Sequence, residues 1–127
     1  MPVIETRIDT KSEAYRENYR IMAERVSDLQ NELRIAREER SEKSLARLAQ
    51  QKKLRVSERL ELLLDRNTPF LEIAPLAAKG LYDKKVHGAG LVAGIGRVCG
   101  REAMVHFNDP TIKGGTIYPM GVKKSLR

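Results

Sequence analysis

Cysteine is almost absent from this 127-residue sequence, since Cys99 is the only one. A single cysteine excludes a disulfide-rich secreted scaffold. Tryptophan is missing, and only two Phe and four Tyr are present, so the expected hydrophobic core is modest. The longest uncharged run, Val86 to Gly96, has eleven residues, of which four are glycine. A membrane-spanning helix needs about 20 apolar residues, so no span is expected.

Glycine is missing from the first half of the chain, because all nine glycines lie at or beyond Gly80. Charge is also divided unevenly. Residues 1–66 carry 15 basic and 13 acidic side chains, whereas residues 67–127 carry 9 basic and 4 acidic ones. The second part therefore holds +5 of the net charge of +7. We predict two unlike parts, an N-terminal helical arm over 1–66 and the start of an α/β domain over 67–127.

The first part has the pattern of an amphipathic helix from Lys11 to Arg40, with neither Gly nor Pro. Its apolar side chains recur at alternating spacings of four and three residues, which places them on one stripe. They are Tyr15, Tyr19, Met22, Val26, Leu29, Leu33 and Ala36. Thr10 or Ser12 can cap the helix. Shorter helices are expected at Glu42–Gln51 and Val56–Asp65, and the long stripe predicts packing on a partner surface.

The second part has the pattern of short strands. Phe70–Ile73, Leu91–Val98 and Glu102–Asn108 are the expected strands, and Cys99-Gly100 has the composition of a tight hairpin turn. Glycines inside the middle strand indicate a bulge or the close approach of another backbone. A glycine-rich loop and the start of a helix follow.

That loop runs from Thr111 to Thr116 and contains two adjacent glycines. It matches neither a Walker motif nor a dinucleotide fingerprint. Two interpretations stay open: its backbone amides bind an anion, or the glycines only supply the dihedral angles of a turn.

The sequence holds no complete catalytic constellation. Cys99 has no histidine nearby in sequence, so we expect an inert thiol. His87 and His106 lack paired metal ligands, and no metal site is expected. The basic cluster Lys52–Arg59 has no interleaved aromatic residue and is flanked by acidic residues, which disfavours nucleic-acid binding. The N-terminus has no signal pattern, so we expect a cytoplasmic protein.

Several segments resemble one family. Gly90–Glu102, Asn108–Pro119 and Val122–Lys124 are similar to the N-terminal domain of carboxyltransferase (β) subunits of biotin-dependent acyl-CoA carboxylases. The Lys-Gly-Gly-Thr and Tyr-Pro pieces favour the methylcrotonyl-CoA branch, with the geranyl-CoA branch as a near relative. Pro110 and Gly121 depart from the usual pattern, which concerns the substrate more than the fold.

The resemblance implies an incomplete crotonase-like fold, a ββα superhelix, preceded by the helical arm. Family subunits transfer carboxylate from N1 of carboxybiotin to the γ-carbon of an acyl-CoA, in the methylcrotonyl case within leucine catabolism. Their oxyanion-stabilising amides would lie downstream of residue 127, so no catalytic residue is expected here and the chain alone should be inactive. The residues implied to lie near CoA are Lys113, Gly114, Gly115 and Thr116. Lys123 and Lys124 would either contact phosphate or be solvated.

The resemblance also implies partners. No cofactor would bind this chain directly, because biotin is carried by the partner biotin carboxylase/carrier (α) subunit. Acyl-CoA and other β subunits are further expected partners, without nucleic acid or membrane. One alternative is a non-catalytic accessory protein that binds CoA or assembles with a full carboxylase.

Overall fold

The computed structural model describes residues 5–83 and 85–127. The chain divides into two compact units, residues 1–32 and 33–127. Helix α1 (Glu13–Glu38) begins in the first unit and ends in the second. The Ser12 hydroxyl accepts a hydrogen bond from the Tyr15 N–H at 3.2 Å, so Ser12 is the capping residue. The predicted long helix is confirmed, with slightly shorter ends.

Two short helices follow α1 in the second unit. Helix α2 (Glu42–Gln50) begins at Ser41, whose hydroxyl accepts from the Ser44 N–H at 3.3 Å. Helix α3 (Val56–Leu63) ends two residues earlier than the sequence predicts. Leu64 is already extended, and the Asp65 N–H donates to the Arg97 carbonyl at 2.8 Å. The chain leaves the helix because this bond to a distant strand replaces the next helical one.

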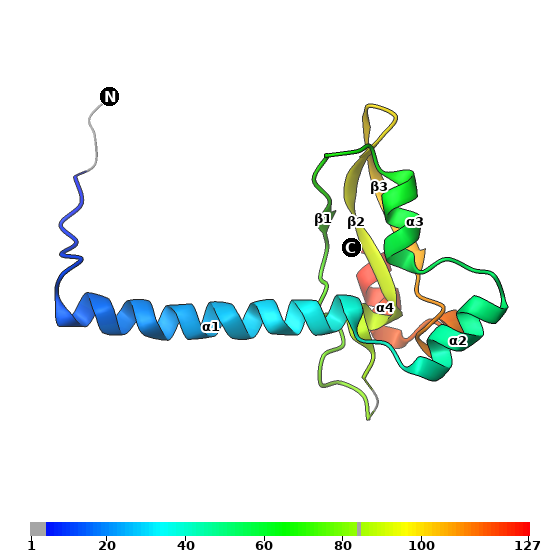
Figure 1. Ribbon diagram of the computed structural model, residues 1–127, viewed down its shortest axis with the longest axis horizontal. Helices are drawn as coiled ribbons and strands as arrows, with labels where there is room; N and C mark the ends of the chain where they lie inside the picture. Colours follow the sequence, from blue (N-terminus) through cyan, green and yellow to red (C-terminus); the bar gives the residue numbers. More distant parts are fainter. Residues whose placement is uncertain (1–4, 84) are drawn as a thin grey trace. The chain divides into compact units, whose positions relative to one another are not determined.

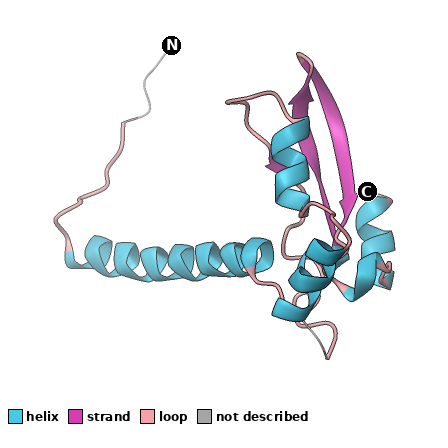
Figure 2. Cartoon of the chain, turned by 45° about the vertical axis from the view of Figure 1, so that its right-hand side comes forward, coloured by secondary structure: helices cyan, strands magenta, loops and turns pink. Residues whose placement is uncertain are grey.

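The second unit contains a three-stranded antiparallel sheet in the order β1-β2-β3 (Figures 1 and 2). The strands are β1 (Leu71–Glu72), β2 (Leu91–Val98) and β3 (Arg101–Asn108). Strands β2 and β3 pair from Leu91↔Asn108 to Val98↔Arg101, which confirms the predicted hairpin. Cys99 and Gly100 both have positive φ, as a two-residue primed turn requires.

Two short 3₁₀ segments and a last helix complete the unit. Segment η1 (His87–Gly90) precedes β2, and segment η2 (Lys113–Gly115) lies in the glycine-rich loop. Helix α4 (Pro119–Ser125) follows, with Pro119 in its first turn. A small core joins these parts: Ala78, Val86, Ala89 and Ile112 are buried, with Tyr82, Tyr118 and Met120 packed against them. The stretch around Ala78 therefore contributes to the core.

Among the described residues, no helix has both the length and the apolar character needed to cross a membrane.

Candidate functional site

The glycine-rich loop makes a tight turn in which three consecutive residues lie in the left-handed region. Lys113, Gly114 and Gly115 have φ values of 47°, 69° and 86°. Glycine adopts such angles without the penalty that a Cβ imposes. The two glycines therefore supply dihedral angles that this turn requires.

Several hydrogen-bonding groups of this loop pair within it. The Gly115 N–H donates to the Ile112 carbonyl at 2.9 Å, and the Thr116 hydroxyl donates to the Lys113 carbonyl at 2.8 Å. The Thr116 N–H also points to that carbonyl, at 3.4 Å. Within residues 5–83 and 85–127, the N–H groups of Lys113 and Gly114, both exposed residues, have no protein acceptor. The loop thus offers an external ligand two adjacent amides and the Lys113 ammonium.

Lys113 lines an open groove of about 1080 Å³. Its Nζ lies 5.2 Å from the centroid of the Tyr118 ring, a cation–π distance. The Tyr118 ring in turn contacts the Tyr82 ring, and the two ring centroids are 4.9 Å apart. Lys43 from α2 and Lys85 also line the groove, and Lys85 forms an exposed ion pair with Glu39 at 2.8 Å. Glu39 and Asp83 line the groove as well, so its positive charge is partly balanced. An anionic ligand with a planar ring would be met at the Lys113 end, where the ammonium adjoins the tyrosine rings.

Sequence reasoning missed Lys43 and Lys85. Lys43 lies on the second helix and Lys85 before β2, both far from Lys113 along the chain. No local motif surrounds either lysine, so no sequence signal could have assigned them to this groove. Only the folding of α2 and of the segment before β2 around the loop brings the three lysines to one groove.

The two lysines of α4 have different surroundings. Lys123 is exposed, as a solvated or phosphate-facing lysine would be. Lys124 is buried, and its Nζ donates to the carbonyls of Gly88 at 3.1 Å and Leu91 at 2.8 Å. This burial lowers the pKa of Lys124 below its ordinary value of 10.5. Lys124 therefore fixes the turn that precedes β2 instead of facing solvent or a phosphate.

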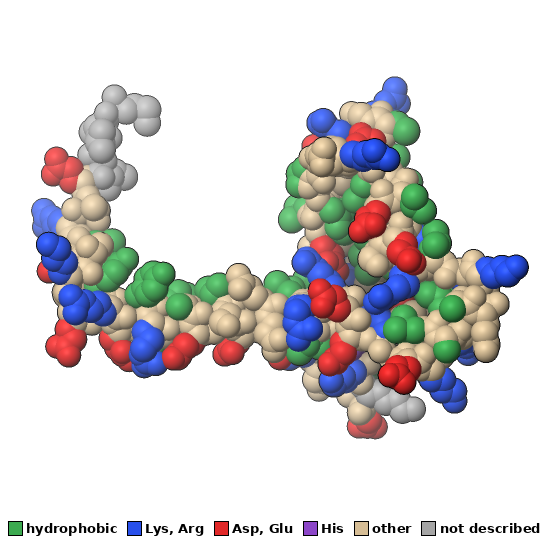
Figure 3. All heavy atoms as spheres, in the orientation of Figure 1, with side chains coloured by type: hydrophobic (Ala, Val, Ile, Leu, Met, Phe, Trp, Pro, Cys, Tyr) green, Lys and Arg blue, Asp and Glu red, His purple; other side chains and the backbone are tan. Residues whose placement is uncertain are grey.

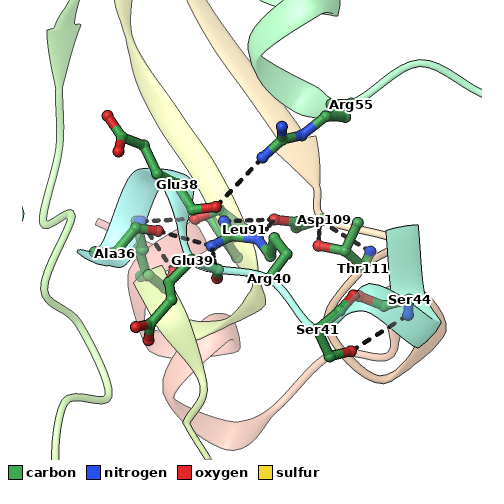
Figure 4. A network of polar contacts seen from close by, with 12 residues as sticks. Ala36, Glu38, Glu39, Arg40, Ser41, Ser44, Arg55, Leu91, Asp109 and Thr111 are labelled. Atoms are coloured by element: carbon green, nitrogen blue, oxygen red, sulfur yellow. Dashed lines mark hydrogen bonds and ion pairs between the residues drawn. The ribbon is translucent and has the colours of Figure 1, made fainter. Parts of the chain in front are cut away.

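A polar network connects the end of α1 to the start of the loop (Figure 4). Arg40 and Asp109 form its centre, with N···O at 2.8 Å and side chains only 9% and 5% exposed. The same pair borders a second cavity, of about 310 Å³, which Arg37 and Arg55 also line. His87 lies nearby, and burial together with the Arg40 charge lowers the pKa of His87 below 6.5.

Cys99 lies exposed at the tip of the hairpin, away from both histidines in sequence. Its N–H and the Gly100 N–H donate to the two carboxylate oxygens of Asp65, at 2.8 and 2.7 Å. His106 contacts the Ser125 hydroxyl at 3.2 Å, but that hydroxyl already donates to the Gly121 carbonyl. In the part of the chain that the structure describes, no three His, Cys, Asp or Glu residues gather to hold a metal ion.

A family model described as a carboxyl transferase domain matches residues 48–127. The chain belongs to the carboxyl transferase domain family. The match contains α3, the whole sheet, the glycine-rich loop and α4. The resemblance inferred from the sequence is confirmed.

Individual carboxyl transferase relatives agree with this assignment. The chain is 44% identical over 126 residues to a probable mitochondrial methylcrotonoyl-CoA carboxylase beta chain of Drosophila melanogaster, covering 98% of the chain and 22% of that relative. It is 49% identical over 102 residues to a biotin-dependent 3-methylcrotonyl-CoA carboxylase beta1 subunit of Mycobacterium tuberculosis. This match covers 80% of the chain and 19% of that relative.

A solved carboxyl transferase structure has the same fold. The beta subunit of geranyl-CoA carboxylase from P. aeruginosa superimposes with a TM-score of 0.73 at 32% identity, covering 98% of this chain and 23% of that one. A mixed helix-and-strand carboxyltransferase fold is thereby established. The chain spans about a fifth of the length of these relatives.

Proposed function

We propose that this chain is the N-terminal part of the carboxyltransferase (β) subunit of a biotin-dependent acyl-CoA carboxylase of the methylcrotonyl-CoA type. The observation that carries the proposal is the 44–49% identity to methylcrotonoyl-CoA carboxylase beta chains over most of this chain. In the complete enzyme, the bond between the carboxyl carbon and N1 of biotin would break, and a carbon–carbon bond to the γ-carbon of the acyl-CoA would form. The γ-carbon would lose a proton in exchange, and N1 of biotin would end protonated.

The contribution of this chain is binding and positioning. Its residues 67–127 would form the start of a crotonase-like ββα superhelix, and residues 1–66 the arm that precedes it. The loop residues Lys113 to Thr116 would lie near CoA, because the Lys113 ammonium and the Lys113 and Gly114 amides are the groups of that loop that are open to a ligand. Lys123, exposed on α4, is a second candidate for a phosphate.

The groove beside the loop supports this assignment chemically. CoA carries phosphate groups and an adenine ring, and the groove offers lysines next to two tyrosine rings. Lys43 extends the positive charge beyond the loop itself. Charge-assisted contacts from lysine to phosphate are stronger than neutral hydrogen bonds, although solvent screens exposed ones.

The proposal includes partners that this chain does not contain. Biotin would arrive on the carrier domain of an α subunit, and other β subunits would complete the assembly. The exposed apolar stripe of α1 would pack on the body of the subunit or on a neighbouring copy. A cytoplasmic location remains a prediction, since the D. melanogaster relative is named as mitochondrial.

The binding part of the proposal is tested by titrating the purified chain with CoA. We expect CoA to bind and Lys113→Gln to weaken binding by about threefold to tenfold, since exposed ionic contacts are modest. Lys79→Gln, a lysine outside the groove, is the control and should leave affinity unchanged. Absence of CoA binding at low salt by a folded, monomeric chain would contradict the proposal.

The catalytic part is tested by supplying the chain with 3-methylcrotonyl-CoA and free carboxybiotin. We expect no carboxylated product, because the amides that would stabilise the reaction are expected downstream of this segment. Turnover by the chain alone would contradict the assignment of the catalytic groups to later parts of the subunit.

A second candidate, an accessory protein that assembles with a full carboxylase, is favoured by the exposed stripe on α1. Incubation with a complete beta subunit followed by size-exclusion chromatography distinguishes the two. Stable co-elution of a folded chain supports an accessory role, and an isolated chain that aggregates supports a piece of a larger subunit.

A further inference from the structure

The end of α1 and the start of the glycine-rich loop are joined by one buried ion pair (Figure 4). Two nitrogens of the Arg40 guanidinium, Nε and Nη2, donate to Oδ2 of Asp109 at 3.0 and 2.8 Å. Both side chains are almost fully buried. Burial weakens screening, so the pair is also more sensitive to geometry than the exposed ion pairs of this chain.

The remaining arm of the guanidinium is held by the helix. Arg40 Nη1 donates to the carbonyls of Ala36 at 3.1 Å and Glu39 at 2.7 Å. The last carbonyls of a helix lack intrahelical partners, and a planar guanidinium can satisfy them. Because the fork is rigid, fixing Nη1 on the helix end also fixes the direction in which Nε and Nη2 point.

Asp109 transmits this fixed direction to the loop. Its second oxygen, Oδ1, accepts the Thr111 N–H at 2.9 Å and also the Thr111 hydroxyl. Its backbone N–H donates to the Gly90 carbonyl at 2.9 Å, and its carbonyl accepts the Ile112 N–H at 3.1 Å. The two carboxylate oxygens thus have separate partners: Oδ2 binds Arg40 at the helix end, and Oδ1 binds Thr111 in the segment that leads into Lys113.

We infer that Arg40 is a positioning residue for the CoA-facing loop, acting through Asp109 and Thr111 on the turn at Lys113–Gly115. The inference rests on the proposed function for its ligand, but the positioning itself concerns the chain alone. A simple helix-capping role would explain only the two bonds from Nη1. A capping role would not explain why the Asp109 carboxylate is buried or why it accepts hydrogen bonds from Thr111.

The test follows the backbone amide signals of Gly114 and Gly115 by ¹H–¹⁵N NMR, together with affinity for CoA. We expect Arg40→Met to move both glycine signals and to weaken CoA binding by about tenfold, because a loosened loop must be ordered on binding. Arg40→Lys keeps the charge but not the fork, so it should move the same signals. The signals of Gly94 and Gly96 in β2 report whether the sheet is intact.

Matched variants separate positioning from general stability. Thr111→Val removes only the hydroxyl contact to Asp109 and should move the Gly114 and Gly115 signals in a folded chain, whereas Thr111→Ser retains the hydroxyl and should restore them. Arg37→Met removes a guanidinium from the same helix end, where it pairs with Glu72 at 3.0 Å, and should leave both glycine signals in place.

Glycine signals that stay unmoved in Thr111→Val overturn the inference, even if Arg40→Met unfolds the chain. Lost CoA binding in Arg40→Met with unmoved glycine signals also overturns it, because Arg40 would then contact the ligand directly. If the unsubstituted chain does not bind CoA, the proposed function fails, and the glycine signals still decide whether Arg40 positions the loop.

Discussion

Gly94 and Gly96 of β2 both make room for a side chain that comes from outside the strand, but different groups fill that room. A Cβ on Gly94 would lie 2.4 Å from Phe70 Cζ and 2.5 Å from the Leu71 carbonyl oxygen of β1. A Cβ on Gly96 would lie 2.5 Å from a terminal methyl group of Leu64. The neighbours of Gly94 include the backbone of the paired strand β1, whereas the nearest neighbour of Gly96 is the movable end of a side chain. The close approach that the sequence predicted is therefore real, and it is strictest at Gly94.

We predict that Gly94→Ala destabilises the chain by about 1–3 kcal/mol, the usual cost of overpacking. Gly96→Ala should cost less, because Leu64 can change its rotamer. Denaturant unfolding of the two variants beside the unsubstituted chain measures both free energies. Equal costs, or a larger cost for Gly96→Ala, would contradict this account of β1 packing on Gly94.

At the scale of elements, α1 is the helix whose apolar stripe is least covered. No residue of α1 is buried, and the side chains of Tyr19, Met22, Val26 and Leu29 are 66%, 58%, 44% and 50% exposed. Figure 3 shows hydrophobic side chains gathered along one side of this helix. Isolated helices are marginal in water, so such a stripe is typical of a helix that packs on a partner.

We predict that Met22→Lys leaves the stability of the chain unchanged within about 0.5 kcal/mol, since the side chain is already exposed. The same substitution should reduce association with a complete beta subunit, because it places a charge in the apolar stripe. Ser27→Lys adds the same charge on the other side of the helix and is the control. Thermal melting and size-exclusion chromatography supply the two measurements. Association that is equally strong in both variants would show that the stripe is not the contact.

At the scale of the whole molecule, the described buried apolar residues all belong to the second unit, from Leu48 to Ile112. His87 directly follows the core residue Val86 in the chain. His87 is half-buried, and burial and the Arg40 charge lower its pKa below the usual 6.5. The folded chain therefore binds a proton at His87 less readily than the unfolded chain does.

The consequence for stability follows from proton linkage. Below pH 6.5 the unfolded chain binds more protons at this site, so the free energy of unfolding should fall as the pH drops from 6.5 toward the lowered pKa of His87. His87→Gln should reduce this loss. Urea unfolding between pH 7.5 and 5 provides the comparison. A pH dependence that survives unchanged in His87→Gln would assign it to other groups.

The sequence by itself determined the elements whose signals are local. The spacing of apolar side chains defined α1, and Cys99-Gly100 between two apolar runs defined the hairpin. The glycines of the loop defined a turn, because only residues that accept positive φ fit there. The family resemblance was also carried by contiguous residues, and the match over residues 48–127 confirms it.

Only the tertiary structure decided the contacts between distant segments. It ended α3 early, buried Lys124, placed Lys43 and Lys85 beside Lys113, and joined Arg40 to Asp109. None of these follows from local spacing, since each depends on where a distant backbone or charge comes to lie. A lysine's own neighbours in sequence determine its helix. The carbonyls or anions that its ammonium meets are determined by the packing of the whole unit.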